Sequence, residues 1–130
     1  MKLETKDWLT RATEDLEALR ELNPDRTPSV IASLAHQAIE KTIKAVWIEL
    51  NLEPPMIHDL EMLWSEIEAS VSESPTTDDF ADVLFEINDY GVQARYPELP
   101  VPARYARDAV ALALRICTYL KTWLENREIS

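Results

Sequence analysis

The chain has 130 residues, of which 46% are hydrophobic and 28% charged, a globular composition that suits one domain spanning residues 1–130. Its 13 Lys and Arg against 24 Asp and Glu give a net charge of −11, which argues against autonomous nucleic-acid binding because such binding neutralises phosphates with basic residues. A single glycine disfavours a β-rich domain, because hairpins and bulges usually need several.

The sequence also predicts a cytoplasmic protein without a membrane segment. No apolar run approaches the roughly 18–20 residues of a membrane span, and the N-terminus has no apolar signal core. The single Cys117 cannot form an internal disulfide and excludes a cysteine-based metal cage. The two histidines, His36 and His58, fit no metal-binding spacing, so we expect neither a metal nor a cofactor.

Apolar residues recur with helical spacing in five segments, which prolines and turn residues separate. Three long and two shorter helices with mostly short connections predict an all-α fold, an antiparallel up-and-down helical bundle with a four-helix-bundle core. In chain order, the expected helices run from about Asp7 to Leu22, from Pro28 to about Asn51, from about Asp59 to Val71, from about Phe80 to Gly91 or shortly before it, and from near Pro102 to about Asn126.

Local signals mark the ends of the first two helices. Asn23-Pro24-Asp25 stops the first helix. Thr27 followed by Pro28 is a favourable start for the second, because proline suits the first helical position, and the Pro54-Pro55 pair is expected to end it.

Similar signals occur later in the chain. The segment Thr76–Asp79 resembles a capping box at the start of the fourth helix. The segment Tyr96–Pro102 contains three prolines and is expected to be a loop. The residues after Trp123 are expected to fray.

The expected second helix carries a narrow polar strip made of His36, Gln37, Glu40, Lys41 and Lys44. At about 100° per residue these side chains fall within an arc of roughly 140°, and apolar residues fill nearly all the rest. Glu40 and Lys44 have the favourable i,i+4 orientation of an ion pair, and His36–Glu40 and Gln37–Lys41 share that spacing. Two interpretations stay open, a solvated face with weak ion pairs or a polar seam that faces a ligand or a partner.

The tripeptide His58-Asp59-Leu60 lies at the entry to the expected third helix. A histidine there can hydrogen-bond exposed backbone groups and hold the loop, and Asp59 is favourable near a helix start. A catalytic histidine would need a nucleophile or a bound water nearby. The structural role is the favoured interpretation.

Arginines and tyrosines gather around the expected loop before the last helix, namely Tyr90, Arg95, Tyr96, Arg104, Tyr105 and Arg107. Arg104 and Arg107 lie one turn apart and can point the same way. Guanidinium groups bind phosphates with paired hydrogen bonds and tyrosines stack on bases, so this segment is a candidate phosphate or nucleotide site. Alternatively, these arginines pair with the acidic excess of the chain.

Taken in order, these segments resemble the HEPN domains, a family of helical-bundle proteins with proposed nucleotide binding. The resemblance spans almost the whole chain. It rests on Asp7-Trp8-Leu9, Asp15-Leu16, the run from Gln37 to Ala45, His58-Asp59-Leu60, and Tyr90 followed by Arg95-Tyr96-Pro97.

The resemblance implies an up-and-down helical bundle, often a homodimer, that works beside a minimal nucleotidyltransferase commonly encoded as its neighbour. Many members are RNA-cleaving toxins that use an arginine followed, after four to six residues, by a histidine. In this chain no histidine lies downstream of Arg95. The Arg–His motif that these members use for RNA cleavage is therefore incomplete in this chain.

The sequence thus predicts a non-catalytic HEPN-type module, of the toxin–antitoxin kind, that binds a nucleotide or a nucleotidyltransferase partner. Lysines and arginines would hold phosphate, and Tyr96 would stack on a base or pack under the loop. The expected contact residues are Glu40, Lys41, Lys44, Arg95, Tyr96 and Arg104.

Two alternatives stay open. One is a divergent RNA-cleaving toxin in which Arg95 stabilises phosphate and His36 or His58 supplies acid–base chemistry. The other is a ligand-free dimeric scaffold with a tryptophan at its interface, namely Trp8, Trp64 or Trp123.

Overall fold

The computed structural model describes residues 1–71 and 79–129. All regular secondary structure in these two ranges is helical, so the expected all-α fold is confirmed. None of the described helices is long and apolar enough to cross a membrane. The helices are α1 (Leu3–Glu21), α2 (Pro28–Glu49), α3 (Leu60–Ser70), α4 (Phe80–Arg95) and α5 (Ala103–Ile129).

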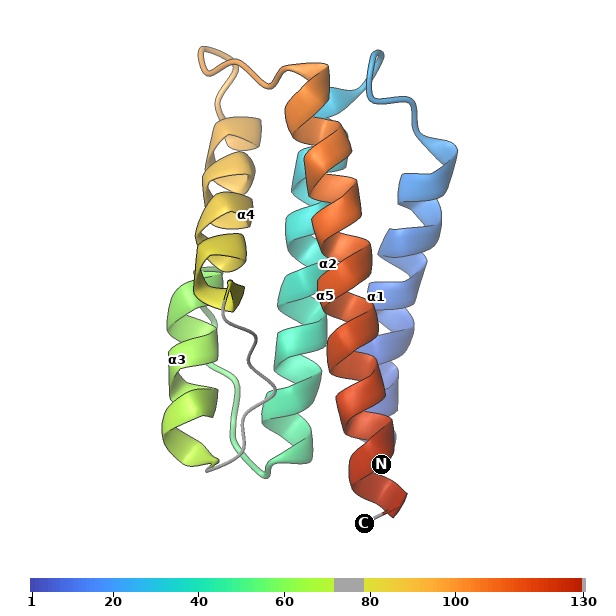
Figure 1. The fold of residues 1–130 in the computed structure, drawn as a ribbon, viewed down its shortest axis with the longest axis vertical. Coiled ribbons are helices and arrows are strands. Elements are labelled where there is room, and N and C mark those ends of the chain that lie inside the picture. The colour runs from blue at the N-terminus through green and yellow to red at the C-terminus, as the bar shows by residue number, and fades with distance from the viewer. Residues whose placement is uncertain (72–78, 130) are drawn as a thin grey trace.

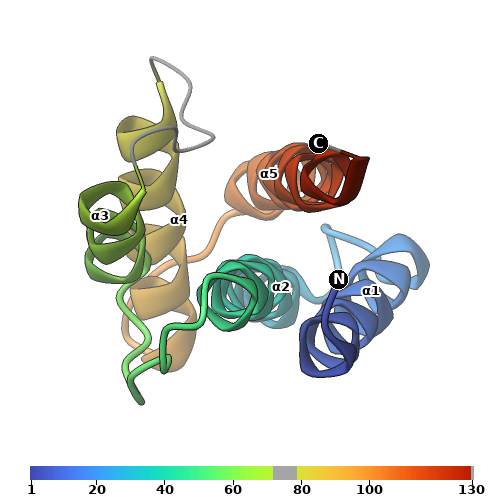
Figure 2. The same cartoon turned by 90° about the horizontal axis from the view of Figure 1, so that it is seen from below.

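Helix α2 is the centre of the bundle and contacts all four other helices. Seen along the bundle in Figure 2, α1 lies on one side of α2, α3 and α4 lie on the other, and α5 packs across α2. Helices α1, α2, α4 and α5 alternate in direction, and the short α3 lies below α4 in Figure 1. The bundle is therefore the expected up-and-down arrangement with one additional short helix.

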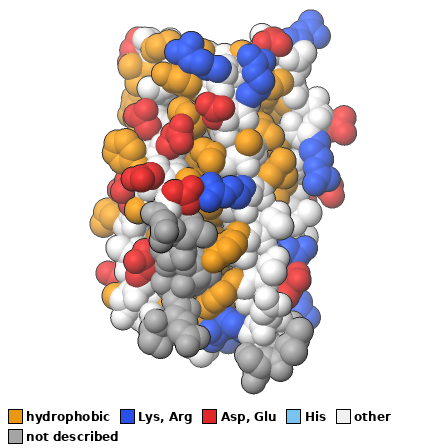
Figure 3. All heavy atoms as spheres, viewed as in Figure 1, with side chains coloured by type: hydrophobic (Ala, Val, Ile, Leu, Met, Phe, Trp, Pro, Cys, Tyr) orange, Lys and Arg blue, Asp and Glu red, His pale blue; other side chains and the backbone are white. Residues whose placement is uncertain are grey.

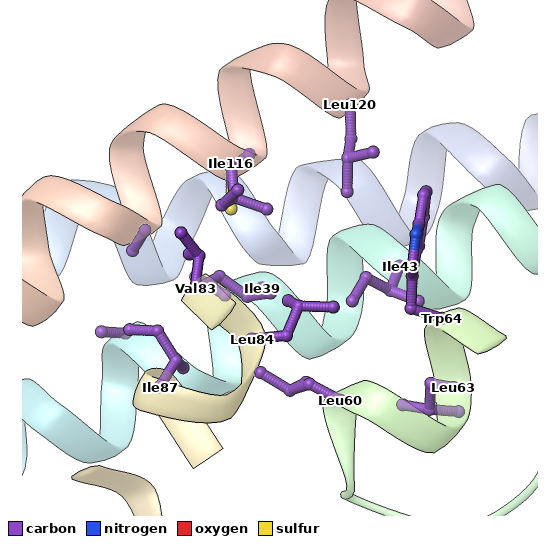
Figure 4. Packing of buried hydrophobic residues seen from close by; sticks show 14 of the residues in the cluster. Ile39, Ile43, Leu60, Leu63, Trp64, Val83, Leu84, Ile87, Ile116 and Leu120 are labelled. Carbon is purple, nitrogen blue, oxygen red and sulfur yellow. The ribbon is translucent and has the colours of Figure 1, made fainter. Parts of the chain in front are cut away.

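The part of the hydrophobic core shown in Figure 4 lies between α2 and the three helices α3, α4 and α5, and Leu9 and Leu19 of α1 extend the core. Ile39 and Ile43 of α2 have no exposed surface, and Trp64 of α3 packs on Phe80 of α4 with ring centroids 4.6 Å apart. These apolar contacts are the main stabilising term of the fold, since each fully buried large side chain contributes about 1.5–3 kcal/mol. They also set the mutual positions of α2, α3 and α4, which carry the site described below.

Helix α2 ends two residues before the expected boundary. Asn51 has a φ of 61°, in the left-handed region that asparagine tolerates better than most residues. The Leu52 N–H donates to the Trp47 carbonyl at 2.9 Å and the Asn51 N–H to the Ile48 carbonyl at 3.0 Å, the two bonds of a Schellman motif. This local motif, rather than the Pro54-Pro55 pair, ends the helix.

Helix α4 continues through Gly91 to Arg95, so the prediction that it ends at Gly91 is wrong. Gly91 does not have a positive φ, and its lack of a side chain serves packing instead. A Cβ atom at this position would lie 2.8 Å from Cδ2 of His36 on α2. Glycine is therefore needed here because the His36 ring lies directly against the α4 backbone.

The two terminal helices are longer than expected. Helix α1 begins at Leu3 rather than Asp7, because the Lys2 N–H and the Thr5 hydroxyl both donate to Glu49 of α2 at 2.9 Å. Helix α5 continues to Ile129, so the expected fraying after Trp123 is not seen.

The capping box expected before α4 is described only at its last residue. Thr76, Thr77 and Asp78 lie outside the described residues. Asp79 is the N-cap residue of α4, but its side chain makes no capping hydrogen bond. Its carboxylate instead accepts hydrogen bonds from Arg115 of α5 at 2.8 and 2.9 Å.

Candidate functional site

The polar strip on α2 is not a solvated face. His36 and Lys44 are buried, with 6% and 7% of their surface exposed, and Glu40 and Lys41 are partly buried. Only Gln37 is exposed. The interpretation as a solvated face is therefore wrong for most of the strip, which is a polar seam inside the fold.

Glu40 is the centre of this seam. Its carboxylate accepts hydrogen bonds from Lys44 Nζ at 3.0 Å and from His58 Nδ1 at 2.9 Å, with only 12% of the side chain exposed. The predicted Glu40–Lys44 ion pair is therefore confirmed. The predicted histidine pairing is not a hydrogen bond, since His36 Nδ1 lies 3.7 Å from Glu40. One carboxylate thus joins α2 to the loop before α3.

The other expected pair on α2, Gln37 with Lys41, does not form. Gln37 Nε2 donates to the Ser33 hydroxyl at 3.1 Å, one turn earlier on the same helix. Lys41 Nζ instead donates to Asp15 of α1 at 2.7 Å. The Asp15 carboxylate therefore keeps the Lys41 ammonium between α1 and α2.

His36 is a structural link between helices. Its Nε2 lies 3.2 Å from Oδ1 of Asn88 on α4, so Nε2 carries the proton and donates. The Asn88 oxygen also accepts from the Leu60 N–H at 3.0 Å, and its Nδ2 donates to Asp59 at 3.0 Å. Asp59 in turn caps α3, as its position predicted, by accepting from two backbone N–H groups of the first turn. One asparagine thus joins α2, α3 and α4.

Burial lowers the pKa of His36 below its ordinary value, and the nearby Glu40 carboxylate only partly offsets this effect. The unfolded chain therefore binds the His36 proton more readily than the folded chain. We expect the free energy of unfolding to fall as the pH drops below about 6.5 and to level off below the folded-state pKa.

Chemical denaturation at several pH values between about 7.5 and 5 tests this prediction, with His36→Gln as the matched variant. Glutamine keeps a donor for Asn88 but cannot titrate. The difference between the two profiles of unfolding free energy against pH is the contribution of His36 titration. Parallel profiles would show that His36 does not cause the loss of stability at low pH.

His58 differs from His36 in being exposed, with 62% of its side chain accessible. Its Nδ1 donates to the Glu40 carboxylate rather than to the backbone groups that the sequence suggested. Its Nε2 makes no hydrogen bond to any residue in the described ranges. Glu40 therefore orients the ring and leaves one imidazole nitrogen facing solvent.

These side chains line a cleft of about 290 Å³ between α2, the loop before α3 and the last turns of α4. We call it the polar cleft. Its lining residues are Ser33, His36, Gln37, Glu40, Lys41, His58, Gly91 and Arg95. Figure 3 shows the face formed by α4 and α5, where acidic side chains gather over α4 and no histidine is visible. The two histidines of the polar cleft are therefore not exposed on the part of this face that Figure 3 shows.

The charge of the polar cleft contrasts with that of the chain. Among the described residues that line it, Glu40 is the only one with a carboxylate, and Lys44 and His58 already bind this group. Arg95, in the last turn of α4, is exposed and makes no ion pair with any described residue. In a chain with a net charge of −11, this cleft therefore presents an uncompensated cation to solvent.

The comparisons with known proteins show the family of this chain. The family model of the HEPN domain matches residues 5–123. The chain belongs to the HEPN family. No curated protein matches it.

Two solved structures share the HEPN fold of this chain. The crystal structure of TT1696 from Thermus thermophilus has a TM-score of 0.79 at 18% identity, covering 93% of this chain and 98% of that one. The structure of ST0689, an archaeal HEPN homologue, has a TM-score of 0.67 at 21% identity, covering 95% and 99%. At these identities the likeness supports the fold alone.

Three of the six predicted contact residues of this HEPN chain meet in the polar cleft, namely Glu40, Lys41 and Arg95. The other three lie elsewhere. Lys44 extends from Glu40 toward the Trp8 ring, 5.9 Å from its centroid. Tyr96 lines a separate cavity, and Arg104 lies over the Tyr105 ring at 5.1 Å.

The other arginine and tyrosine residues around the loop before α5 contact residues of this chain. Tyr105 stacks on Tyr90 with centroids 5.0 Å apart, and burial together with the Glu86 carboxylate raises the pKa of Tyr90. Arg107 forms an ion pair with Asp25 at 3.3 Å. For this arginine the structure therefore supports the alternative prediction that the arginines pair with acidic residues of the chain.

Some lining and linking residues were missed by sequence reasoning. Ser33, Gly91 and Asn88 were not singled out as site residues. The sequence does contain one indication for Asn88, since this polar residue directly follows Ile87, which belongs to the buried apolar stripe of α4. Nothing in the sequence indicated that Gly91 faces His36.

Proposed function

We propose that this HEPN chain is a binding module that holds the phosphate group of a nucleotide in the polar cleft, and that a minimal nucleotidyltransferase is its protein partner. The observation that carries the proposal is Arg95, an exposed guanidinium with no ion pair among the described residues. It lines a cleft in which the Glu40 carboxylate is already bound. A guanidinium binds phosphate with two parallel hydrogen bonds, and so fits this position.

The other lining groups suit the same ligand. The Gln37 amide and the exposed Nε2 of His58 are additional hydrogen-bonding groups at the cleft. Glu40 would repel a phosphate, but the Lys44 ammonium at 3.0 Å compensates its charge. Lys41 adds a further cation, although Asp15 shares its charge.

Calorimetric titration with AMP tests the proposal. We expect Arg95→Ala to weaken binding at least about tenfold, because hydrogen bonds between charged groups contribute about 1.5–3 kcal/mol. Arg104→Ala is the matched control, since it removes an exposed arginine that does not line the cleft. This variant is expected to bind like the wild type.

Affinity capture of the tagged chain from its native host, followed by mass spectrometry of the captured proteins, tests the partner. An absence of heat with AMP, ADP and ATP, together with no nucleotidyltransferase in the captured fraction, would contradict the proposed function.

A second candidate function is RNA cleavage, which the Glu40–His58 contact favours. A carboxylate that holds one imidazole nitrogen while the other faces solvent is a suitable arrangement for a general acid or base. Arg95 lines the same cleft and would stabilise the phosphate. His36 is less suited to this role than His58, because it is buried and bound to Asn88.

Expression in a bacterial host separates the two candidates. Growth arrest that both Arg95→Ala and His58→Gln relieve, while both variants remain folded, would favour cleavage. Normal growth together with AMP binding would favour the binding module.

A further inference from the structure

A second cavity, of about 440 Å³, lies beside the polar cleft between the loop before α3, α3 and α4. We call it the side cavity. It shares three lining residues with the polar cleft, namely His36, His58 and Arg95. The two hollows are therefore adjoining parts of one site, with Arg95 and His58 at their common boundary.

The side cavity differs from the polar cleft in chemistry. Ile57, Met62 and Val92 give it apolar walls, and Met62 and Val92 are exposed by 56% and 47%. The Asn88 oxygen already accepts from Leu60 and His36, and Asp59 Oδ1 accepts from Asn88 and from the first turn of α3. The side cavity thus favours a flat apolar group held mainly by contact rather than by hydrogen bonds.

We infer that the side cavity is the subsite for the nucleobase of a nucleoside monophosphate whose phosphate lies at Arg95. This inference rests on the proposed function and adds the position and the chemical class of the remaining part of the ligand. The base would lie against Met62 and Val92, with the His58 ring, held by Glu40, as a stacking surface. The sugar would cross the boundary between the two hollows.

The cavity that Tyr96 lines is the competing position for the base. It also measures about 440 Å³, and its walls include Pro28, Leu99 and Val101. It shares only Arg95 with the polar cleft, whereas the side cavity shares three residues. A ribose is a short connector, so the cavity with the longer common boundary is the better match for the base.

The inference predicts that the base adds affinity to that of the sugar phosphate. AMP is expected to bind about tenfold more tightly than ribose 5-phosphate, because stacking of a base on a side chain is a substantial, sequence-tolerant contribution.

Calorimetry with AMP, ribose 5-phosphate and inorganic phosphate tests the inference on the wild type and on a Met62→Ser/Val92→Ser variant. Both substituted residues are exposed, so the fold is expected to survive, which circular dichroism checks. We expect the variant to bind AMP no better than ribose 5-phosphate, with ribose 5-phosphate binding unchanged. Tyr96→Ser and Phe85→Ser are matched controls, one in the competing cavity and one exposed on α4 outside both hollows.

The outcomes distinguish this inference from the proposed function. Equal affinities of AMP and ribose 5-phosphate for the wild type would overturn the base subsite and leave phosphate binding intact. Loss of the AMP preference in Tyr96→Ser but not in the double variant would also overturn it, in favour of the Tyr96 cavity. If none of the three compounds binds, both the inference and the proposed function fail.

Discussion

Replacing Glu40 with alanine is expected to lower the free energy of unfolding by about 3 kcal/mol. Lys44 is buried, with 7% of the residue exposed. In the described part of the chain, the ion-pair partner of its ammonium group is the Glu40 carboxylate at 3.0 Å. Its other described charge contact is with the Trp8 ring, 5.9 Å away. Removal of Glu40 would therefore leave a buried charge largely uncompensated, and His58 would lose the group that orients it.

Urea denaturation of Glu40→Ala, Lys44→Met and the double variant measures this effect. We expect the double variant to be more stable than Glu40→Ala alone, because methionine fills the space of the lysine stem without a charge. Arg107→Ala is the control, since it breaks an exposed ion pair and should leave the unfolding free energy nearly unchanged. If Glu40→Ala behaved like this control, the buried-charge explanation would be wrong.

Gly91→Ala is expected to destabilise the fold by about 2 kcal/mol, although alanine is the better helix former. The new Cβ would lie 2.8 Å from Cδ2 and 3.0 Å from Cγ of His36. Both atoms belong to the buried imidazole ring, which is hydrogen-bonded to Asn88. The ring therefore has to move, and the hydrogen bond of 3.2 Å between His36 Nε2 and Asn88 Oδ1 is strained or lost.

A double-mutant cycle with His36→Ala tests this cause through the sign of the effect. Without the imidazole, Gly91→Ala is expected to stabilise the chain by about 0.5–1 kcal/mol, the intrinsic preference of a helix for alanine over glycine. The free energies of unfolding of the four proteins complete the cycle. A destabilisation of the same size in both backgrounds would rule out the contact with His36 as its cause.

The sequence by itself determined the helices and most of their boundaries. Helical periodicity marked five apolar stripes, Pro28 opened α2, and Asp59 was recognised at the start of α3, where it caps the helix. Such features depend on residues a few positions apart, so they can be read locally. The resemblance to HEPN domains rests on the same ordered motifs, and the family model confirms it.

Part of the candidate site also followed from sequence. Glu40 and Lys41 stood out as members of a narrow polar strip, and Arg95 as an arginine in a strongly acidic chain. The structure places all three in the polar cleft. Tyr96 and Arg104 are close to Arg95 in sequence, yet they lie outside this cleft.

Only the tertiary structure decided which neighbours cover each face of the helices. Periodicity placed Lys44 in the polar strip, and His58 was recognised at the entry to α3. Neither pattern indicated that both side chains bind the Glu40 carboxylate. It interpreted Gly91 as a helix end, whereas the close approach of His36 from another helix makes it a packing position inside α4. The physical reason is that burial, ion pairing and close packing depend on contacts between segments far apart in the chain. The sequence pattern of one helix does not show which side chains of another helix will contact it.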